Sequence, residues 1–109
     1  MAGFVKGEVL VLPFPFSDLS GSKRRPALVL ADLPGDDIIL CQITSQDSKD
    51  SLAVALASSD FAEGSLPVSS FIRPSRIFTA DKSIIIRKAG KVRKAVVDNV
   101  TRQIIKLIE

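Results

Sequence analysis

The sequence predicts a mainly β protein, built as a small and strongly bent β-barrel with one C-terminal α-helix. Three observations lead to this fold class. Short apolar runs rich in strand formers recur along the chain, glycine and proline residues separate them, and the C-terminal stretch follows the helical period instead. With 109 residues, of which 46% are hydrophobic, the chain suffices for one domain with a single modest core.

The clearest predicted element is a hairpin formed by residues 26–31 and 38–43. Both segments are almost continuously apolar, which is typical of strands that are covered on both faces. One face can line a barrel, and the other requires a helix or a second subunit over it. Residues 33–36 between them, Leu-Pro-Gly-Asp, carry a turn signal, because proline presets φ and glycine accepts a positive φ.

The register of this hairpin places a basic side chain opposite a hydroxyl. A turn centred on residues 34 and 35 pairs Leu33 with Asp36, and the same register continued to the open end pairs Arg25 with Thr44. Directly opposed residues lie about 5 Å apart at Cβ. We therefore expect the Arg25 guanidinium and the Thr44 hydroxyl to converge as a pair that can bind phosphate and act in catalysis.

The same signals predict the remaining strands and loops. We expect strands at residues 7–13, 52–56 and 68–73, a strand or short turn at 76–79, and a further apolar run at 84–87. Polar or glycine-containing connections are expected at residues 14–25, 45–51 and 61–67.

Residues 91–109 have the pattern of an amphipathic helix, with charged residues on the face opposite the apolar one. Arg93 projects onto the apolar side, so the packed part of the helix is expected to begin after it. Ile105 projects onto the polar side. The apolar face consists of Val92, Val96, Val97, Val100, Ile104, Leu107 and Ile108.

Composition excludes several classes of function. The chain has no histidine and one cysteine, Cys41, which is expected to be a buried core thiol because it lies in an apolar run. No metal-ligand spacing is present, and no serine has a catalytic base beside it, so neither a metal site nor a cofactor is expected. No apolar run is long enough to cross a membrane, and the N-terminus lacks the pattern of a secretory signal. The expected compartment is the cytoplasm.

The net charge of +3 is unevenly distributed. Basic residues form three clusters. Such clusters suit binding to a polyanion or to an acidic partner chain, and solvated loops are the alternative interpretation. Phe16, in the loop before the first cluster, can either stack on a base or anchor its loop on the barrel. The clusters are Lys23, Arg24 and Arg25; Arg73, Arg76 and Lys82; and Arg87, Lys88, Lys91, Arg93 and Lys94.

Four segments resemble, in the correct order, the MazF/PemK toxins of bacterial toxin–antitoxin systems. The step from Arg25 to Pro26, followed by an apolar strand, is the most specific of them. The resemblance covers nearly the whole chain, so residues 1–109 are expected to form a single MazF/PemK-like domain. The segments are residues 7–9 (Gly-Glu-Val), 13–30 (from Pro13 to Leu30), 42–45 (Gln-Ile-Thr-Ser) and 70–75 (Ser-Phe-Ile-Arg-Pro-Ser).

The resemblance implies an SH3-like barrel with a C-terminal helix, a homodimer, and ribosome-independent cleavage of single-stranded RNA. It also implies a cognate antitoxin whose acidic C-terminal segment wraps the dimer. The family's catalytic arginine and threonine fall on Arg25 and Thr44. One branch adds an essential arginine, which falls on Arg73, but it also uses a histidine, absent here, and an aspartate where this chain has Ser75. The RNA contacts are therefore expected from Lys23, Arg24, Ser45, Arg73, Ser75, Arg76 and Phe16.

The expected chemistry is metal-independent attack of a 2′-OH on its own phosphorus, which leaves a 2′,3′-cyclic phosphate and a 5′-OH. Arg25 can donate two parallel hydrogen bonds to the phosphate, and Thr44 can add a third donor. Glu8 and Asp18 are candidates for the base, and the sequence places neither. Two alternatives remain open: a non-catalytic SH3-like barrel that binds nucleic acid or a partner peptide, and gyrase inhibition by a related fold.

Overall fold

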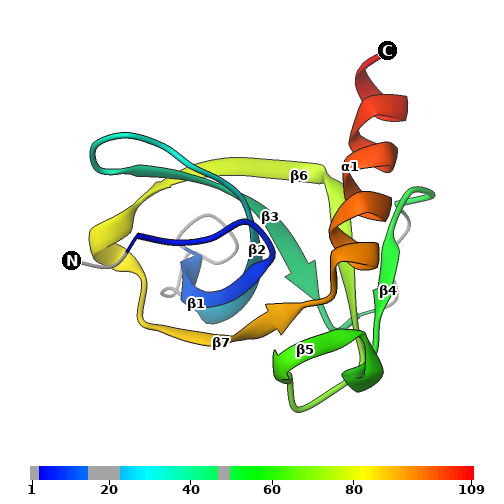
Figure 1. The fold of residues 1–109 in the computed structure, drawn as a ribbon, viewed down its shortest axis with the longest axis horizontal. Helices are drawn as coiled ribbons and strands as arrows, with labels where there is room; N and C mark the ends of the chain where they lie inside the picture. The colour runs from blue at the N-terminus through cyan, green and yellow to red at the C-terminus, as the bar shows by residue number, and fades with distance from the viewer. Residues whose placement is uncertain (1–2, 15–22, 47–49) are drawn as a thin grey trace.

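The computed structural model describes residues 3–14, 23–46 and 50–109, so the expected contacts of Phe16 and Asp18 lie outside the described residues. Figure 1 shows a curled sheet with a C-terminal helix beside it. The strands are β1 (Glu8–Phe14), β2 (Lys23–Asp32), β3 (Asp37–Thr44), β4 (Val54–Leu56), β5 (Phe61–Gly64), β6 (Ser70–Asp81) and β7 (Arg87–Val92). The helices are the 3-10 turns η1 (Ser58–Asp60) and η2 (Lys82–Ile84), and α1 (Lys94–Ile108).

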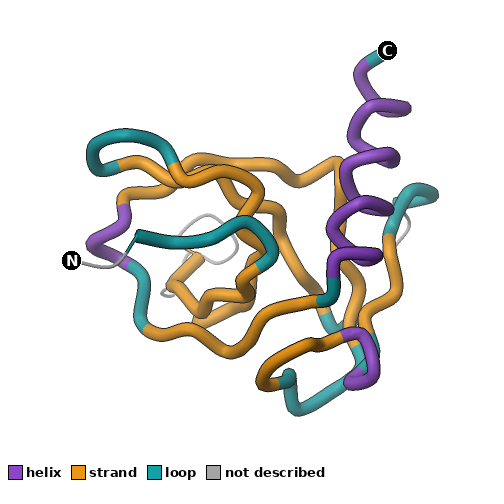
Figure 2. The backbone as a smooth tube through the Cα atoms, in the orientation of Figure 1, coloured by secondary structure: helices purple, strands orange, loops and turns teal. Residues whose placement is uncertain are grey.

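The described strands form one antiparallel sheet in the order β4-β6-β3-β2-β1-β7-β5. Figure 2 shows this layer curling round on itself as a half-barrel, with α1 at one side. The helix packs against β6 and β4. The predicted mainly β fold with a C-terminal helix is therefore confirmed. Among the described residues, no helix combines the length and the apolar character that a membrane span requires.

Apolar clusters cover both faces of the β2–β3 hairpin, as its two apolar strands predict. On one face, Leu28 and Cys41 are fully buried and pack in the same cluster as Val100 of α1. On the other face, Val29 and Leu40 are fully buried in a second cluster with residues of β1. Burial of each such aliphatic side chain contributes about 1.5–3 kcal/mol. The helix thus covers one face of the hairpin, and the barrel interior covers the other.

The β2–β3 register agrees with the prediction toward the open end and differs near the turn. Val29 pairs with Leu40, as predicted. Nearer the turn Asp32 pairs with Ile38, so the predicted pairing of residues 33 and 36 is wrong. A β-bulge directly after Val29 absorbs the difference of one residue. The register that leads to the open end is consequently the predicted one.

Two segments predicted as loops contain strands. Residues 23–25 begin β2, because they continue its pairing along the end of β1. Residues 61–64 form β5, whose Gly64 pairs with Gly90 of β7. Gly64 has φ +63°, and a Cβ there would lie 2.2 Å from the Ala89 carbonyl oxygen. The glycine that resembled a loop signal is required by this close approach of two backbones.

Strand β6 joins two segments that the sequence predicted separately. Its register with β3 shifts between Cys41 and Ile43, which leaves residues 73–76 as a bulge. Pro74 is buried in this bulge, where its missing N–H breaks no ladder bond. The helix predicted from residue 91 begins later, because Lys91 and Val92 pair in β7, and α1 starts after Arg93, as expected for its packed part.

Candidate functional site

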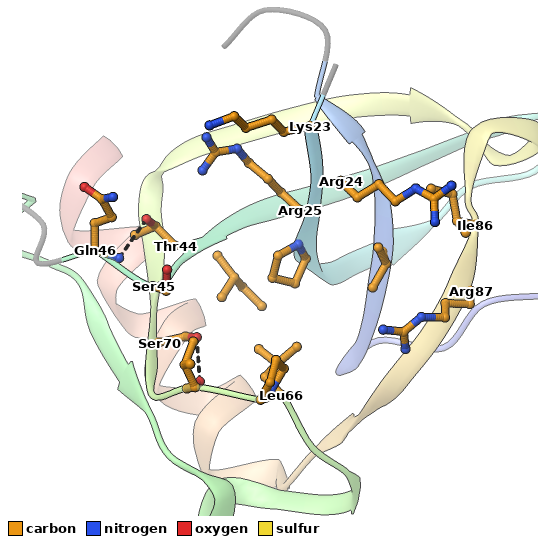
Figure 3. Close-up of a pocket in the computed structure, with 15 residues that line it drawn as sticks. Lys23, Arg24, Arg25, Thr44, Ser45, Gln46, Leu66, Ser70, Ile86 and Arg87 are labelled. Atoms are coloured by element: carbon orange, nitrogen blue, oxygen red, sulfur yellow. Dashed lines mark hydrogen bonds between the residues drawn. The ribbon is translucent and has the colours of Figure 1, made fainter. Parts of the chain in front are cut away.

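The open end of the β2–β3 hairpin borders a pocket of about 490 Å³, which lies within the usual size range of ligand sites. Figure 3 shows Lys23, Arg25 and Thr44 on one side of the pocket and Arg24, Ile86 and Arg87 on the other. Strands β1, β2, β3 and β7 and the connection before β6 all contribute. The lining residues predicted from the sequence are Lys23, Arg24, Arg25, Thr44 and Ser45.

Arg25 and Thr44 both line this pocket, from the ends of β2 and β3 (Figure 3). The backbone N–H of Gln46 donates to Thr44 Oγ1 at 3.2 Å. Since that oxygen already accepts a hydrogen bond, the hydroxyl proton remains available for donation to a ligand. Arg25 Nε is buried and has no hydrogen-bond partner among the described residues. Among the described residues, no group accepts a hydrogen bond from either donor.

Among the described residues, no carboxylate neutralises the positive charge of the pocket. Lys23, Arg24, Arg25 and Arg87 all line it, and none of the described lining residues is acidic. Within residues 3–14, 23–46 and 50–109, no ion pair joins any of these four cations to a carboxylate. Unpaired cations beside hydroxyl groups are the electrostatic pattern of an anion site, and phosphate backbones bind to such sites.

Arg87 and the apolar wall were not predicted as site residues. The sequence placed Arg87 only within a basic cluster, because nothing in it shows that β7 lies beside β1. Leu66, Val68 and Ile86 form the apolar side of the pocket, and Val68 and Ile86 are 55% and 42% exposed. Their exposed position next to the basic residues was the only available signal, and it exists only in the folded chain.

Arg73, Ser75 and Arg76 are placed in the β6 bulge, and the pocket lining does not include them. Ser75 instead donates to Asp50, at 2.6 Å from its hydroxyl and 3.3 Å from its N–H. Burial raises the pKa of Asp50, but hydrogen bonds from Ser75 and Leu52 and the charge of Arg73 outweigh it, so the pKa lies below 3.8. This cluster ties the segment after β3 to the bulge.

Cys41 lies beneath the same bulge and is fully buried, as predicted. Its thiol donates to the Arg73 carbonyl oxygen at 2.9 Å. Burial raises the pKa of the thiol to about 12, with Asp50 adding to the shift and Arg73 opposing it. The thiol is therefore protonated at neutral pH and is not a nucleophile.

Glu8, one of the two carboxylates considered as a base, is engaged away from the pocket. It accepts a hydrogen bond from the Val5 N–H at 2.7 Å and forms an ion pair with Lys88 at 3.0 Å. The other candidate, Asp18, lies outside the described residues. In the described part of the chain, no group of three or more histidine, cysteine or acidic side chains is arranged to hold a metal ion.

Comparison with known proteins adds one family and several similar folds. The sequence profile of the family described as "PemK-like, MazF-like toxin of type II toxin-antitoxin system" matches residues 5–108. A structure of MazF from Deinococcus radiodurans (Form-I) is 22% identical, with a TM-score of 0.77 over 99% of this chain and 98% of that chain. No curated protein sequence matches the chain.

Two further solved structures have the same fold. One is an endoribonuclease in complex with its cognate antitoxin from a Mycobacterial species, which is 19% identical, with a TM-score of 0.73 over 94% of this chain and 92% of that chain. The other is the Mycobacterium tuberculosis toxin MazF-mt6, which is 15% identical, with a TM-score of 0.64 over 87% and 91%. At these identities the likeness shows the fold alone.

Proposed function

Since the chain belongs to the PemK-like, MazF-like toxin family of type II toxin–antitoxin systems, we propose that it is an endoribonuclease toxin that cleaves single-stranded RNA in the basic pocket. The observation that carries the proposal is the convergence of Arg25 and Thr44 on a pocket whose cations have no carboxylate partner among the described residues. A backbone phosphate supplies the missing negative charge. The solved endoribonuclease of the same fold supports the same reaction class.

In the proposed reaction the 2′-oxygen forms a bond to the adjacent phosphorus, and the bond from phosphorus to the 5′-oxygen breaks. The 2′-OH gives up its proton and the departing 5′-oxygen gains one, so the products carry a 2′,3′-cyclic phosphate and a 5′-OH. Arg25 donates two hydrogen bonds to the phosphate oxygens, and Thr44 donates a third. These donors stabilise the charge that develops in the transition state, without a metal ion.

The family also supports partners for this chain. A solved relative is bound to its cognate antitoxin, and we propose that this chain is neutralised by an antitoxin whose acidic C-terminal segment pairs with its basic surface. Ile105, Leu107 and Ile108 of α1 are 49%, 46% and 75% exposed, which supports a homodimer that covers them. A toxin directed at messenger RNA acts in the cytoplasm.

The proposal is tested by incubating a long, poorly structured RNA with the protein in excess EDTA. Wild type is expected to give discrete fragments with 5′-OH and cyclic phosphate ends. Arg25→Ala is expected to give none, because the phosphate loses its bidentate donor. Arg102→Ala removes an exposed arginine of α1 outside the pocket, and this matched control is expected to cleave like wild type.

The alternative, a barrel that binds nucleic acid without cutting it, predicts a different result. RNA that stays intact while the protein retards it on a gel would favour that binding module. Intact RNA without any retardation would overturn both proposals and direct the basic residues to an acidic protein partner. Growth arrest on expression of the chain alone is expected only of the toxin.

A further inference from the structure

We propose that Arg87, together with Arg24, forms a second phosphate site across the pocket from Arg25 and Thr44, so that the bound RNA extends over β1 toward β7. The inference rests on the proposed function. It adds that the protein also binds a part of the RNA beyond the cleaved bond. Arg87 thereby becomes a binding and positioning residue at the flanking nucleotide.

The strand register supplies the separation between the two sites. Val11 of β1 is the Cα partner of Pro26 on one side and of Arg87 on the other. Neighbouring strands lie about 4.7–4.9 Å apart, so Pro26 and Arg87 are about 10 Å apart across β1. Opposed residues share a face of the sheet, which places Arg87 on the face of Pro26 and Arg24.

The side-chain directions agree with two sites. In Figure 3, Lys23 and Arg25 extend toward the side of Thr44, whereas Arg24 extends toward Ile86 and Arg87 extends from β7 into the pocket. A phosphate held by Arg25 and Thr44 therefore leaves Arg24 and Arg87 available for another phosphate. A chain with one negative charge per nucleotide fits this spacing of cations.

Lys88, the next residue along β7, has the carboxylate partners that Arg87 lacks among the described residues. Lys88 forms ion pairs with Glu8 and Glu63, both at 3.0 Å. Arg87 forms no ion pair with any carboxylate of the described segments. Within the described segments, carboxylates thus pair with Lys88 outside the pocket and not with Arg87 inside it.

Apolar side chains lie between the two groups of cations. Pro26 and Ile43 line the pocket, as do the exposed side chains of Val68 and Ile86. Single-stranded RNA presents unstacked bases that pack against such surfaces between charged backbone contacts. The pocket therefore offers, in this order along one direction, a position for a phosphate, a position for a base and a position for a second phosphate.

The test measures the affinity for a mixed-sequence 2′-O-methyl RNA oligonucleotide, which cannot be cleaved, over a series of KCl concentrations. Loss of one phosphate contact reduces the slope of log K against log salt by about 0.7 for single strands. Arg87→Gln is expected to reduce the slope by this amount. Arg87→Lys keeps the positive charge and is expected to have the wild-type slope. The matched control Arg102→Gln, which makes the same charge change on α1, is expected to keep the wild-type slope.

A second readout uses cleavable RNA. Arg87→Gln is expected to raise KM several-fold and to lower kcat less, whereas Arg25→Ala lowers kcat. A wild-type slope and KM for Arg87→Gln, in a protein that cleaves RNA, would overturn the second site and leave the proposed function intact. An equal change of slope in Arg102→Gln would also overturn it. Absence of cleavage by wild type would instead contradict the proposed function, and the slope measurement would still decide the second site.

Discussion

Arg87 and Lys88 are adjacent on β7, yet they lie in opposite electrostatic settings. Lys88 is held between two carboxylates, one of them on the buried Glu8. Arg87 faces the pocket, where no described lining residue is acidic. Adjacent cations of one strand thus differ in charge compensation, because Lys88 has two carboxylate partners and Arg87 has none among the described residues. A cluster of cations attracts a ligand of the opposite charge.

The largest effect is expected for Arg25→Lys, which keeps the charge of the pocket and removes the fork of donors. We expect kcat for RNA cleavage to fall about 10²–10³-fold, the usual cost of losing a preorganised transition-state donor. The rate constant is measured by single-turnover cleavage, with the protein in excess at a concentration that saturates the RNA. If Arg25→Lys retained the wild-type rate, positive charge alone would suffice, and the geometry of the pocket would not matter.

A smaller effect, on stability, is expected on the neutralised side. Glu8→Ala leaves the Val5 N–H without its acceptor and removes one of the two carboxylates that pair with Lys88, which should lower the free energy of unfolding by about 1–3 kcal/mol. Urea denaturation measures this change. Glu63→Ala is the matched control, because Glu63 is exposed, and its effect should be smaller. RNA affinity should stay at the wild-type value in both variants, and a loss of affinity in folded Glu8→Ala would break the comparison.

The smallest effect is a pH dependence at Asp50, another neutralised site. Its pKa is lowered on folding, so the carboxylate stabilises the fold above its unfolded value near 3.8, and this contribution disappears as the pH falls through the lower folded value. Asp50→Asn should therefore be less stable than wild type at neutral pH, with the gap closing in acid. Urea midpoints measured from neutral pH to below 3.8 test this, and a gap that stays constant would exclude the ionised carboxylate as its source.

The sequence predicted part of the site because that part depends on local register. A hairpin of two apolar strands brings Arg25 and Thr44 to its open end for any turn geometry. The predicted turn pairing was wrong, but the bulge after Val29 keeps the predicted register toward that end. Arg87 could not be found in this way. Its position depends on β7 pairing with β1, which lies far away in the sequence.

The fold was predictable for a related reason. Periodicity reports which residues are buried, and it identified the helix, the hairpin and the burial of Cys41. It did not identify β5, because the Glu63-Gly64 step has the local pattern of a loop. Only the contact between Gly64 and Ala89 shows why a glycine is needed in that strand.

The sequence by itself thus determined the fold class, the family, and the position of Arg25 and Thr44 at the end of one hairpin, since these follow from residue types and short-range spacing. The tertiary structure decided which of the described cations lack a carboxylate partner and which apolar side chains border them. It also decided that Arg73 and Ser75 lie in a bulge, where Ser75 contacts Asp50, instead of lining the pocket. The physical reason is that charge compensation depends on distances between strands, and the amino-acid sequence alone does not give those distances.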